Sequence, residues 1–134
     1  MRFLLDTHIL FWAICDENKI PKSVLDVINK RENAIFFSSA SVWEVVIKHE
    51  KNQQKMPVSG QEFLDGCINA GFIPLSIDYN HVLNVSNLHR KSNEPQHNDP
   101  FDRLLISQAK TEEMTLITHD KLLSGYEEKC VKII

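Results

Sequence analysis

The sequence predicts an α/β fold, specifically a three-layer α/β/α sandwich around a central parallel sheet. Short apolar runs alternate along the chain with longer stretches of helical period, which is the pattern of an α/β domain. Most of these runs are continuously apolar, as expected of parallel strands that are buried on both faces. The 134 residues, 43% of them hydrophobic, are enough for one core, so we expect a single domain over 1–134.

Five runs are short and apolar enough to be strands. The predicted strands are 2–5, 34–37, 72–75, 115–117 and 130–133. The segments that separate them carry helical periodicity, so they can serve as the crossovers that parallel strands require. The sheet should therefore be wholly parallel.

The predicted helices fill the intervals between the strands. They span about 7–15, 21–31, from 39–41 onward, 59–70, 78–88 and 100–110. Pro21 suits the first turn of the second helix, and Gly71 suits the end of the fourth. The polar segment 90–98 contains Pro95 and is predicted to be an exposed loop.

Composition excludes several function classes. A net charge of −3 argues against a protein that coats nucleic acid through a basic bulk. Cys15, Cys67 and Cys130 are odd in number and lack C-x-x-C spacing, so we expect core packing rather than disulfides or a zinc site. No apolar run is as long as a membrane span, and an acid follows too early for a signal peptide, so we expect a cytoplasmic location.

Acidic residues recur where predicted strands give way to helices. They are Asp6, Glu44, the pair Asp99 and Asp102, and Asp120. In a parallel sheet such junctions share one edge, where ligands bind. Carboxylates gathered there repel each other unless a cation lies among them, and hard oxygen ligands suit Mg²⁺ or Mn²⁺. The pattern predicts a metal centre.

Each acid also has a simpler interpretation as a helix cap, which stays open. Ser41-x-x-Glu44 fits a capping box. Asp99 and Asp102 fit the N-cap and N3 positions of one helix, and Asp120 could cap a short helix that reaches Leu123. Capping does not require an acid at all of these sites, so the full set favours the metal centre.

Neighbouring polar residues could support such a centre. The candidates for a supporting or RNA-contacting role are Thr7, Ser41, Lys48, Arg103 and Thr118. Lys48 lies one turn after Glu44 and Arg103 lies beside Asp102, so each could form an ion pair or hold a phosphate. His97 is expected to brace the loop before its helix. Trp12 and Trp43 are expected to pack in the core or at a partner interface rather than stack on bases.

Four segments, taken together, resemble the successive motifs of PIN-domain ribonucleases, in particular the VapC toxins of type II toxin–antitoxin modules. The segments are Leu4-Leu5-Asp6-Thr7-His8, Ser41-Val42-Trp43-Glu44, His97-Asn98-Asp99-Pro100-Phe101-Asp102-Arg103 and Ile117-Thr118-His119-Asp120. They occur in the family's order and at plausible spacings over essentially the whole chain. Each is weak alone, but the combination is specific.

The resemblance implies a PIN-like fold and an endoribonuclease toxin that uses Mg²⁺ or Mn²⁺ to hydrolyse RNA with a metal-activated water. It further implies 5′-phosphate and 3′-hydroxyl products, inhibition by a cognate antitoxin, and a homodimer. Asp6, Glu44 and Asp120 match the first, second and fourth family acids. The third could be Asp99 or Asp102, of which Asp102 aligns better.

One departure from the family pattern lies after the Glu44 helix. The segment 51–56 is polar and lacks the glycine and short apolar stretch that relatives often carry there, which leaves contacts to RNA or a partner at this point open. The alternative function is a catalytically silent PIN-like domain that binds RNA or protein. A silent relative would be expected to lose at least one acid, and this chain has kept them all.

Overall fold

A computed structural model describes all 134 residues and contains one five-stranded sheet in the order β3-β2-β1-β4-β5. Every neighbouring pair of strands is parallel. The strands are β1 (Arg2–Leu5), β2 (Ala34–Ser38), β3 (Ile73–Leu75), β4 (Thr115–Thr118) and β5 (Val131–Ile133). All five predicted strands are therefore present, with ends that differ from the prediction by one residue at most.

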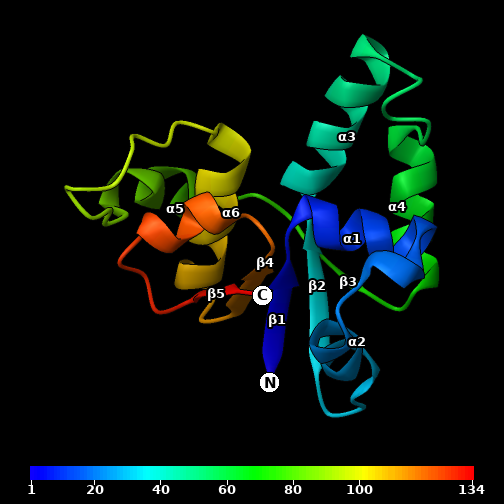
Figure 1. The fold of residues 1–134 in the computed structure, drawn as a ribbon, viewed down its shortest axis with the longest axis horizontal. Helices are drawn as coiled ribbons and strands as arrows, with labels where there is room; N and C mark the ends of the chain where they lie inside the picture. The colour runs from blue at the N-terminus through cyan, green and yellow to red at the C-terminus, as the bar shows by residue number, and fades with distance from the viewer.

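Six α-helices and three short 3₁₀ helices connect the strands. The α-helices are α1 (Thr7–Cys15), α2 (Lys22–Asn29), α3 (Ser39–Lys51), α4 (Gly60–Asn69), α5 (Tyr79–Leu83) and α6 (Pro100–Thr111). The 3₁₀ helices are η1 (Glu17–Lys19), η2 (Asn84–Asn87) and η3 (Lys121–Gly125). The helices α1, α2 and α4 lie on one side of the sheet, and α5 and α6 lie on the other (Figure 1). The predicted three-layer α/β/α sandwich is confirmed.

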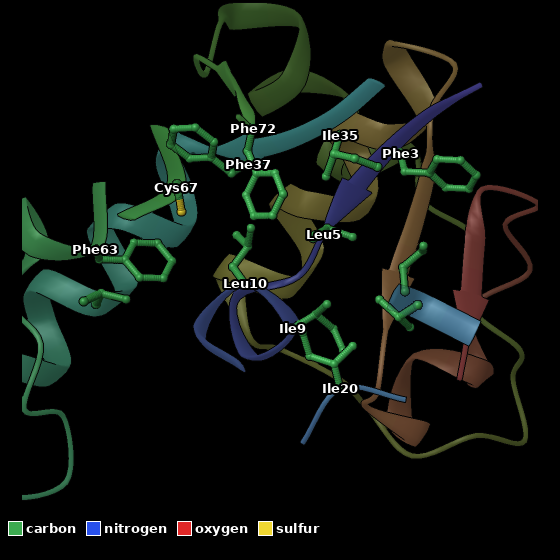
Figure 2. Packing of buried hydrophobic residues seen from close by; sticks show 13 residues of the cluster. Phe3, Leu5, Ile9, Leu10, Ile20, Ile35, Phe37, Phe63, Cys67 and Phe72 are labelled. Carbon is green, nitrogen blue, oxygen red and sulfur yellow. The ribbon is translucent and has the colours of Figure 1, made fainter. Parts of the chain in front are cut away.

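Alternation along each strand divides the apolar side chains between two cores. Leu5 and Phe37 pack with α1, α2 and α4, whereas Leu4 and Leu116 pack with α6 on the opposite face. Figure 2 shows the first core, in which Phe37, Phe72, Leu10 and Cys67 lie close together. Because both faces of the sheet are covered, the central strands read as continuous apolar runs.

The strand order creates a switch point next to β1. The chain passes from β1 to β2 and β3 on one side, then returns past β1 to add β4 and β5 on the other. Open α/β sheets bind ligands beyond the carboxyl ends of the strands at such a point. Asp6 follows β1 directly, and Thr118 ends β4, so both residues lie at this edge.

Some local predictions were wrong. The helix predicted over 78–88 is broken, because α5 stops at Leu83 and the chain continues as the 3₁₀ helix η2. The second helix begins after Pro21, which takes the N-cap position, and ends at Asn29. Cys15 is exposed rather than packed in the core.

No helix has the length and apolar character needed to cross a membrane.

Candidate active site

Asp6 is the most deeply buried acid of the site, with 5% of its surface exposed. It caps α1, and its Oδ1 accepts the Ile9 backbone N–H at 2.9 Å. Its Oδ2 accepts the hydroxyl of Thr118, which comes from the neighbouring strand β4. Burial raises the pKa of Asp6, although these hydrogen bonds oppose the shift. The capping and metal-centre interpretations therefore apply to the same side chain.

Glu44 lies in the second turn of α3, and its side chain is 12% exposed. Its Oε1 accepts the Thr7 hydroxyl at 2.7 Å, and its Oε2 pairs with Lys48 Nζ at 2.8 Å. Ser41 Oγ lies 2.9 Å from the same Thr7 hydroxyl. Thr7, Ser41 and Lys48 thus fix the orientation of one carboxylate.

The predicted capping box between Ser41 and Glu44 was wrong. Strand β2 extends one residue further than predicted, and α3 begins immediately after it at Ser39. Ser38 is consequently the N-cap, and its hydroxyl accepts the Ala40 backbone N–H at 2.9 Å. Glu44 has no capping role and is free to face Thr7 and the other acids.

Asp99 and Asp102 occupy one turn of α6 but have different surroundings. Asp99 is exposed and caps the helix, with its Oδ1 accepting the backbone N–H groups of Phe101 at 2.9 Å and Asp102 at 3.0 Å. The Asp102 side chain is 22% exposed and accepts no helix amide. Its Oδ2 lies 3.3 Å from Nε2 of His97. The geometry gives Asp99 the cap and leaves Asp102 available for a ligand.

The pKa of Asp102 reports how the acids are arranged. Burial raises it to about 7, helped by the negative charges of, in order, Asp99, Asp120, Glu44 and Asp6. Each of the other four predicted acids is therefore close enough to Asp102 to disfavour its charged form. The negative charges of these four acids therefore act on Asp102 at the carboxyl edge of the sheet.

Asp120, the fifth acid of the group, lies two residues after the end of β4. Its Oδ1 accepts the Leu122 backbone N–H at 2.9 Å and so caps η3, as its capping interpretation predicted. Its own backbone N–H donates to the Thr118 hydroxyl oxygen at 3.1 Å. Carboxylate oxygens of Asp120 and Asp102 and a ring nitrogen of His97 all lie within 4.8 Å of one another. Thr118 connects this group to Asp6.

Asp102 is contacted by His97, which is in turn bound by Tyr126, a pairing that the sequence did not indicate. The His97 side chain is 6% exposed, and its Nδ1 lies 2.7 Å from the Tyr126 hydroxyl. If the buried phenol donates its proton to Nδ1, the neutral ring carries its own proton on Nε2 and donates it to Asp102. Tyr126 is 29 residues from His97, so no local spacing could have revealed the pair.

Arg103 does not pair with Asp102, contrary to one of its two predicted roles. Its guanidinium donates to the Val85 backbone carbonyl at 3.2 Å. Its charge also lowers the pKa of Tyr126, against the larger effect of burial, which raises it. Arg103 therefore connects the start of α6 to η2, although its position next to Asp102 in the sequence suggested an ion pair.

The donor set suits a hard divalent cation. The clustered groups are carboxylates, with hydroxyls between them and the His97 imidazole beside Asp102, and Mg²⁺ and Mn²⁺ prefer the oxygen ligands that dominate this set. Burial and mutual repulsion raise the pKa of Asp102, and a cation among the acids would reverse that effect. Asp6, Glu44, Asp102 and Asp120 are the residues that could hold such an ion.

A second group of potential ligands is structural. Asp78, His81 and Glu112 lie together at the C-terminal end of α6, the opposite end from Asp99 and Asp102. His81 is buried, its Nδ1 accepts the Asp78 backbone N–H at 3.1 Å, and its Nε2 lies 2.9 Å from Glu112 Oε2. Both ring nitrogens are therefore used within the protein, in a capping box that starts α5.

The family model of the PIN domain matches residues 3–129, and the chain belongs to this family. No curated protein sequence matches the chain. Three solved structures share its fold over almost the full length of both chains. They are VapBC2 from Rickettsia felis bound to a DNA fragment from their promoter, DNA-bound VapBC from Salmonella typhimurium, and VapBC-1 from nontypeable Haemophilus influenzae.

The Rickettsia felis structure has a TM-score of 0.73 at 19% identity, covering 100% of this chain and 99% of that one. The Salmonella typhimurium structure has a TM-score of 0.65 at 14% identity, covering 99% and 98%. The Haemophilus influenzae structure has a TM-score of 0.61 at 13% identity, also covering 99% and 98%. At these identities the likeness establishes the fold.

The raised pKa of Asp102 predicts that the metal-free protein loses stability as pH rises. The unfolded carboxyl releases its proton near pH 3.8 and the folded one near 7, so within this window the folded state holds the extra proton. In chelator, the free energy of unfolding should fall by on the order of 1–3 kcal/mol between about pH 5 and pH 8. Thermal melting of wild type and Asp102→Asn measures this, and a wild-type decline no steeper than that of the variant would contradict it.

Proposed function

We propose that the chain is a metal-dependent endoribonuclease of the VapC toxin type, which hydrolyses RNA and is neutralised by a cognate antitoxin. The observation that carries the proposal is the placement of the acids at the switch point of the sheet, where the Asp102 and Asp120 carboxylates lie within 4.8 Å of each other and Thr118 bonds to both Asp6 and Asp120. Capping would not require an acid at every one of these positions, since serine, threonine and asparagine are also good N-caps, and Glu44 and Asp102 cap no helix. Convergence raises the free energy of the charged site, and binding a cation offsets that.

The site residues would divide the work as follows. Asp6, Glu44, Asp102 and Asp120 would hold one or two Mg²⁺ or Mn²⁺ ions, while Asp99 would keep the α6 N-terminus ordered. A bound ion supplies positive charge for the phosphoryl oxygens and lowers the pKa of water at the site. Thr7 and Thr118 fix the orientation of Glu44 and Asp6 through hydrogen bonds, which limits the reorganisation needed during the reaction.

The N-termini of three helices support phosphate binding at this edge. The helices α1, α3 and α6 all begin there, and their first backbone N–H groups and dipoles favour an anion. The substrate would therefore present its phosphodiester to the carboxyl edge of the sheet. Lys48, whose ammonium group pairs with Glu44, is positioned to contact this phosphodiester as well.

An antitoxin partner is supported by the kind of structures that share this fold. All three are VapBC complexes, and two of them contain DNA. We propose by analogy that this chain is neutralised by a protein encoded alongside it, and that it forms a homodimer. DNA contact would then belong to the assembled complex rather than to this chain alone.

The decisive experiment incubates the purified protein with mixed RNA in Mg²⁺, in Mn²⁺ and in chelator. We expect internal cleavage with either ion, no cleavage in chelator, and products that end in 5′-phosphate and 3′-hydroxyl groups. Cleavage that persists in chelator would rule out the metal mechanism. A folded protein that shifts its melting temperature with metal but cleaves no RNA would favour the silent binding domain.

The third acid can be resolved by comparing Asp99→Asn with Asp102→Asn. Asparagine is a good N-cap, so Asp99→Asn should keep the hydrogen bonds to Phe101 and Asp102 and reduce cleavage by less than about 10-fold. Asp102→Asn removes a ligand charge and should reduce cleavage by at least about 100-fold. Initial rates at saturating metal distinguish the two, and a larger loss from Asp99→Asn would reverse their roles.

A further inference from the structure

A groove of about 560 Å³ lies next to the acid site, between α1 and the C-terminal half of α3 with the turn that follows it. Its two walls differ in chemistry. The side chains that matter are His8, Phe11 and Trp12 from α1, and Lys48, Lys51 and Lys55 from the other wall. One wall is mainly aromatic and the other is cationic.

The charge of the groove departs from that of the rest of the molecule. The chain as a whole has 18 acidic against 15 basic residues and a net charge of −3. Of the nine residues that line the groove, three are lysines and none is acidic. This local excess of positive charge beside an acidic site favours an anionic occupant.

The groove is continuous with the acid site through two residues. Thr7 and Lys48 both line the groove, and both also bind the Glu44 carboxylate, at 2.7 Å and 2.8 Å. An extended anion that lies in the groove would therefore reach the acids at one end. Its nearest charged group would meet Lys48 first.

The cationic wall is built on a fixed turn. Lys55 lies in the segment 51–56, which departs from the family pattern. Asn52 ends α3, and its Oδ1 accepts the backbone N–H groups of Gln54 at 3.0 Å and Lys55 at 3.1 Å. Nδ1 of His49 lies 2.8 Å from the Met56 carbonyl oxygen. Lys51 and Lys55 line the groove on this wall together with Lys48.

The aromatic wall narrows the kind of anion. Phe11 and Trp12 are partly buried, and the Trp12 ring meets His119 edge-on at 5.4 Å between centroids. Bases stack on such rings only when they are unpaired, as in a single strand. The volume falls within the roughly 300–1,000 Å³ of sites that hold a small organic molecule, so a nucleotide fits.

We propose that this groove binds single-stranded RNA next to the scissile phosphodiester, with phosphates at Lys48, Lys51 and Lys55 and a base against Trp12. The inference rests on the proposed ribonuclease function and specifies the side of the acid site from which the strand enters. An acidic segment of a partner protein is the other occupant that the charge would suit. The aromatic wall favours the nucleic acid.

The test measures RNA binding in chelator, where metal-dependent cleavage cannot interfere. The probe is a labelled single-stranded RNA of about 12 nucleotides and mixed sequence, followed by fluorescence anisotropy over a range of salt concentrations. The double variant Lys51→Glu/Lys55→Glu should weaken binding at least about 10-fold. It should also reduce the slope of log K against log salt by about 1.4, since each lost phosphate contact on a single strand contributes about 0.7.

The matched control is Lys22→Glu/Lys30→Glu, which makes the same charge change on exposed residues at the two ends of α2. Helix α2 lies at the opposite end of β1 and β2 from α3 (Figure 1). The control should weaken binding less than about 3-fold and leave the salt slope unchanged. In a Trp43→Phe background, RNA should also quench Trp12 fluorescence, and the Lys51→Glu/Lys55→Glu variant should abolish the quenching.

The outcomes separate this inference from the proposed function. Equal effects of the two double variants on binding would overturn the groove while leaving metal-dependent cleavage intact. Groove variants that bind RNA normally but resist inhibition by a partner protein would assign the groove to that partner, which also overturns the inference. If RNA binding depended on the groove lysines but the protein cleaved no RNA under any condition, the proposed RNA-binding groove would be supported and the proposed nuclease activity would be overturned.

Discussion

Asp6→Asn is expected to reduce RNA cleavage by at least about 100-fold while the protein stays folded. Asp6 is the acid with the least solvent around it, and its two oxygens are held by the Ile9 amide and the Thr118 hydroxyl. Asparagine keeps Oδ1 as the acceptor for Ile9 but removes the negative charge. The loss should therefore fall on metal binding and on the rate, rather than on the start of α1.

Whereas cleavage should fall, the stability of the metal-free Asp6→Asn protein should stay the same or rise. Burial raises the pKa of Asp6, which means that the folded protein holds its charged form at a cost. In chelator near neutral pH, Asp6→Asn should therefore melt at the same temperature as wild type or higher. Added Mn²⁺ should raise the melting temperature of wild type and have little effect on the variant, because a ligand stabilises only the state that binds it.

The control for this prediction is Asp26→Asn, which makes the same chemical change at an exposed position on α2. It should leave cleavage, metal response and stability within error of wild type. Wild-type cleavage by Asp6→Asn with the same metal dependence would contradict the proposed centre. A loss of cleavage together with a large loss of stability would assign Asp6 to the fold instead.

The carboxyl-edge convergence of the acids was predictable because it follows from topology. Once the strands were assigned as parallel, the carboxyl ends of β1 and β4 had to lie at the same edge of the sheet. Asp6 and Thr118, at these two ends, are therefore close enough for the hydrogen bond that joins them. The continuous apolar runs sufficed for this assignment. The structure confirms it, since every neighbouring pair of strands is parallel.

The division of roles between Asp99 and Asp102 was not predictable from their spacing. Residues three apart on a helix share a face, and either could cap or point outward. The decision depends on the backbone at Asp99, which is extended and places its carboxylate over the amides of the first turn. Asp102 then faces His97, which is itself positioned by a residue from the far end of the chain.

The error at Ser41 has a similar origin. The residues 38, 39 and 41 are all serine, and each is an acceptable N-cap. In the structure Ser38 is the N-cap and α3 starts at Ser39, so Glu44 lies in the second turn of the helix, where it accepts the Thr7 hydroxyl instead of capping. Element boundaries are the least certain part of a sequence-based prediction. Here a shift of the N-cap by three residues, from Ser41 to Ser38, removes Glu44 from the cap.

Phe37→Ala is expected to destabilise the protein by about 3–5 kcal/mol. Phe37 is 1% exposed and lies on β2, next to the central strand β1. Its side chain belongs to the same buried cluster as Leu10 of α1 and Phe72 before β3 (Figure 2). Removing it opens a cavity that three different elements would have to move to close. Urea denaturation with an unchanged m value would measure the loss directly.

The same substitution connects the core to the site. Phe37 is followed by Ser38, the cap of α3, and α3 carries both Glu44 and Lys48. Phe37→Leu retains most of the buried volume and should cost less than about 1.5 kcal/mol. Val82→Ala, at an exposed position on α5, should cost less than about 0.5 kcal/mol. If Phe37→Ala cost no more than Val82→Ala, the core between β2 and α1 would not be the packing that holds the Glu44 helix against the rest of the acid site.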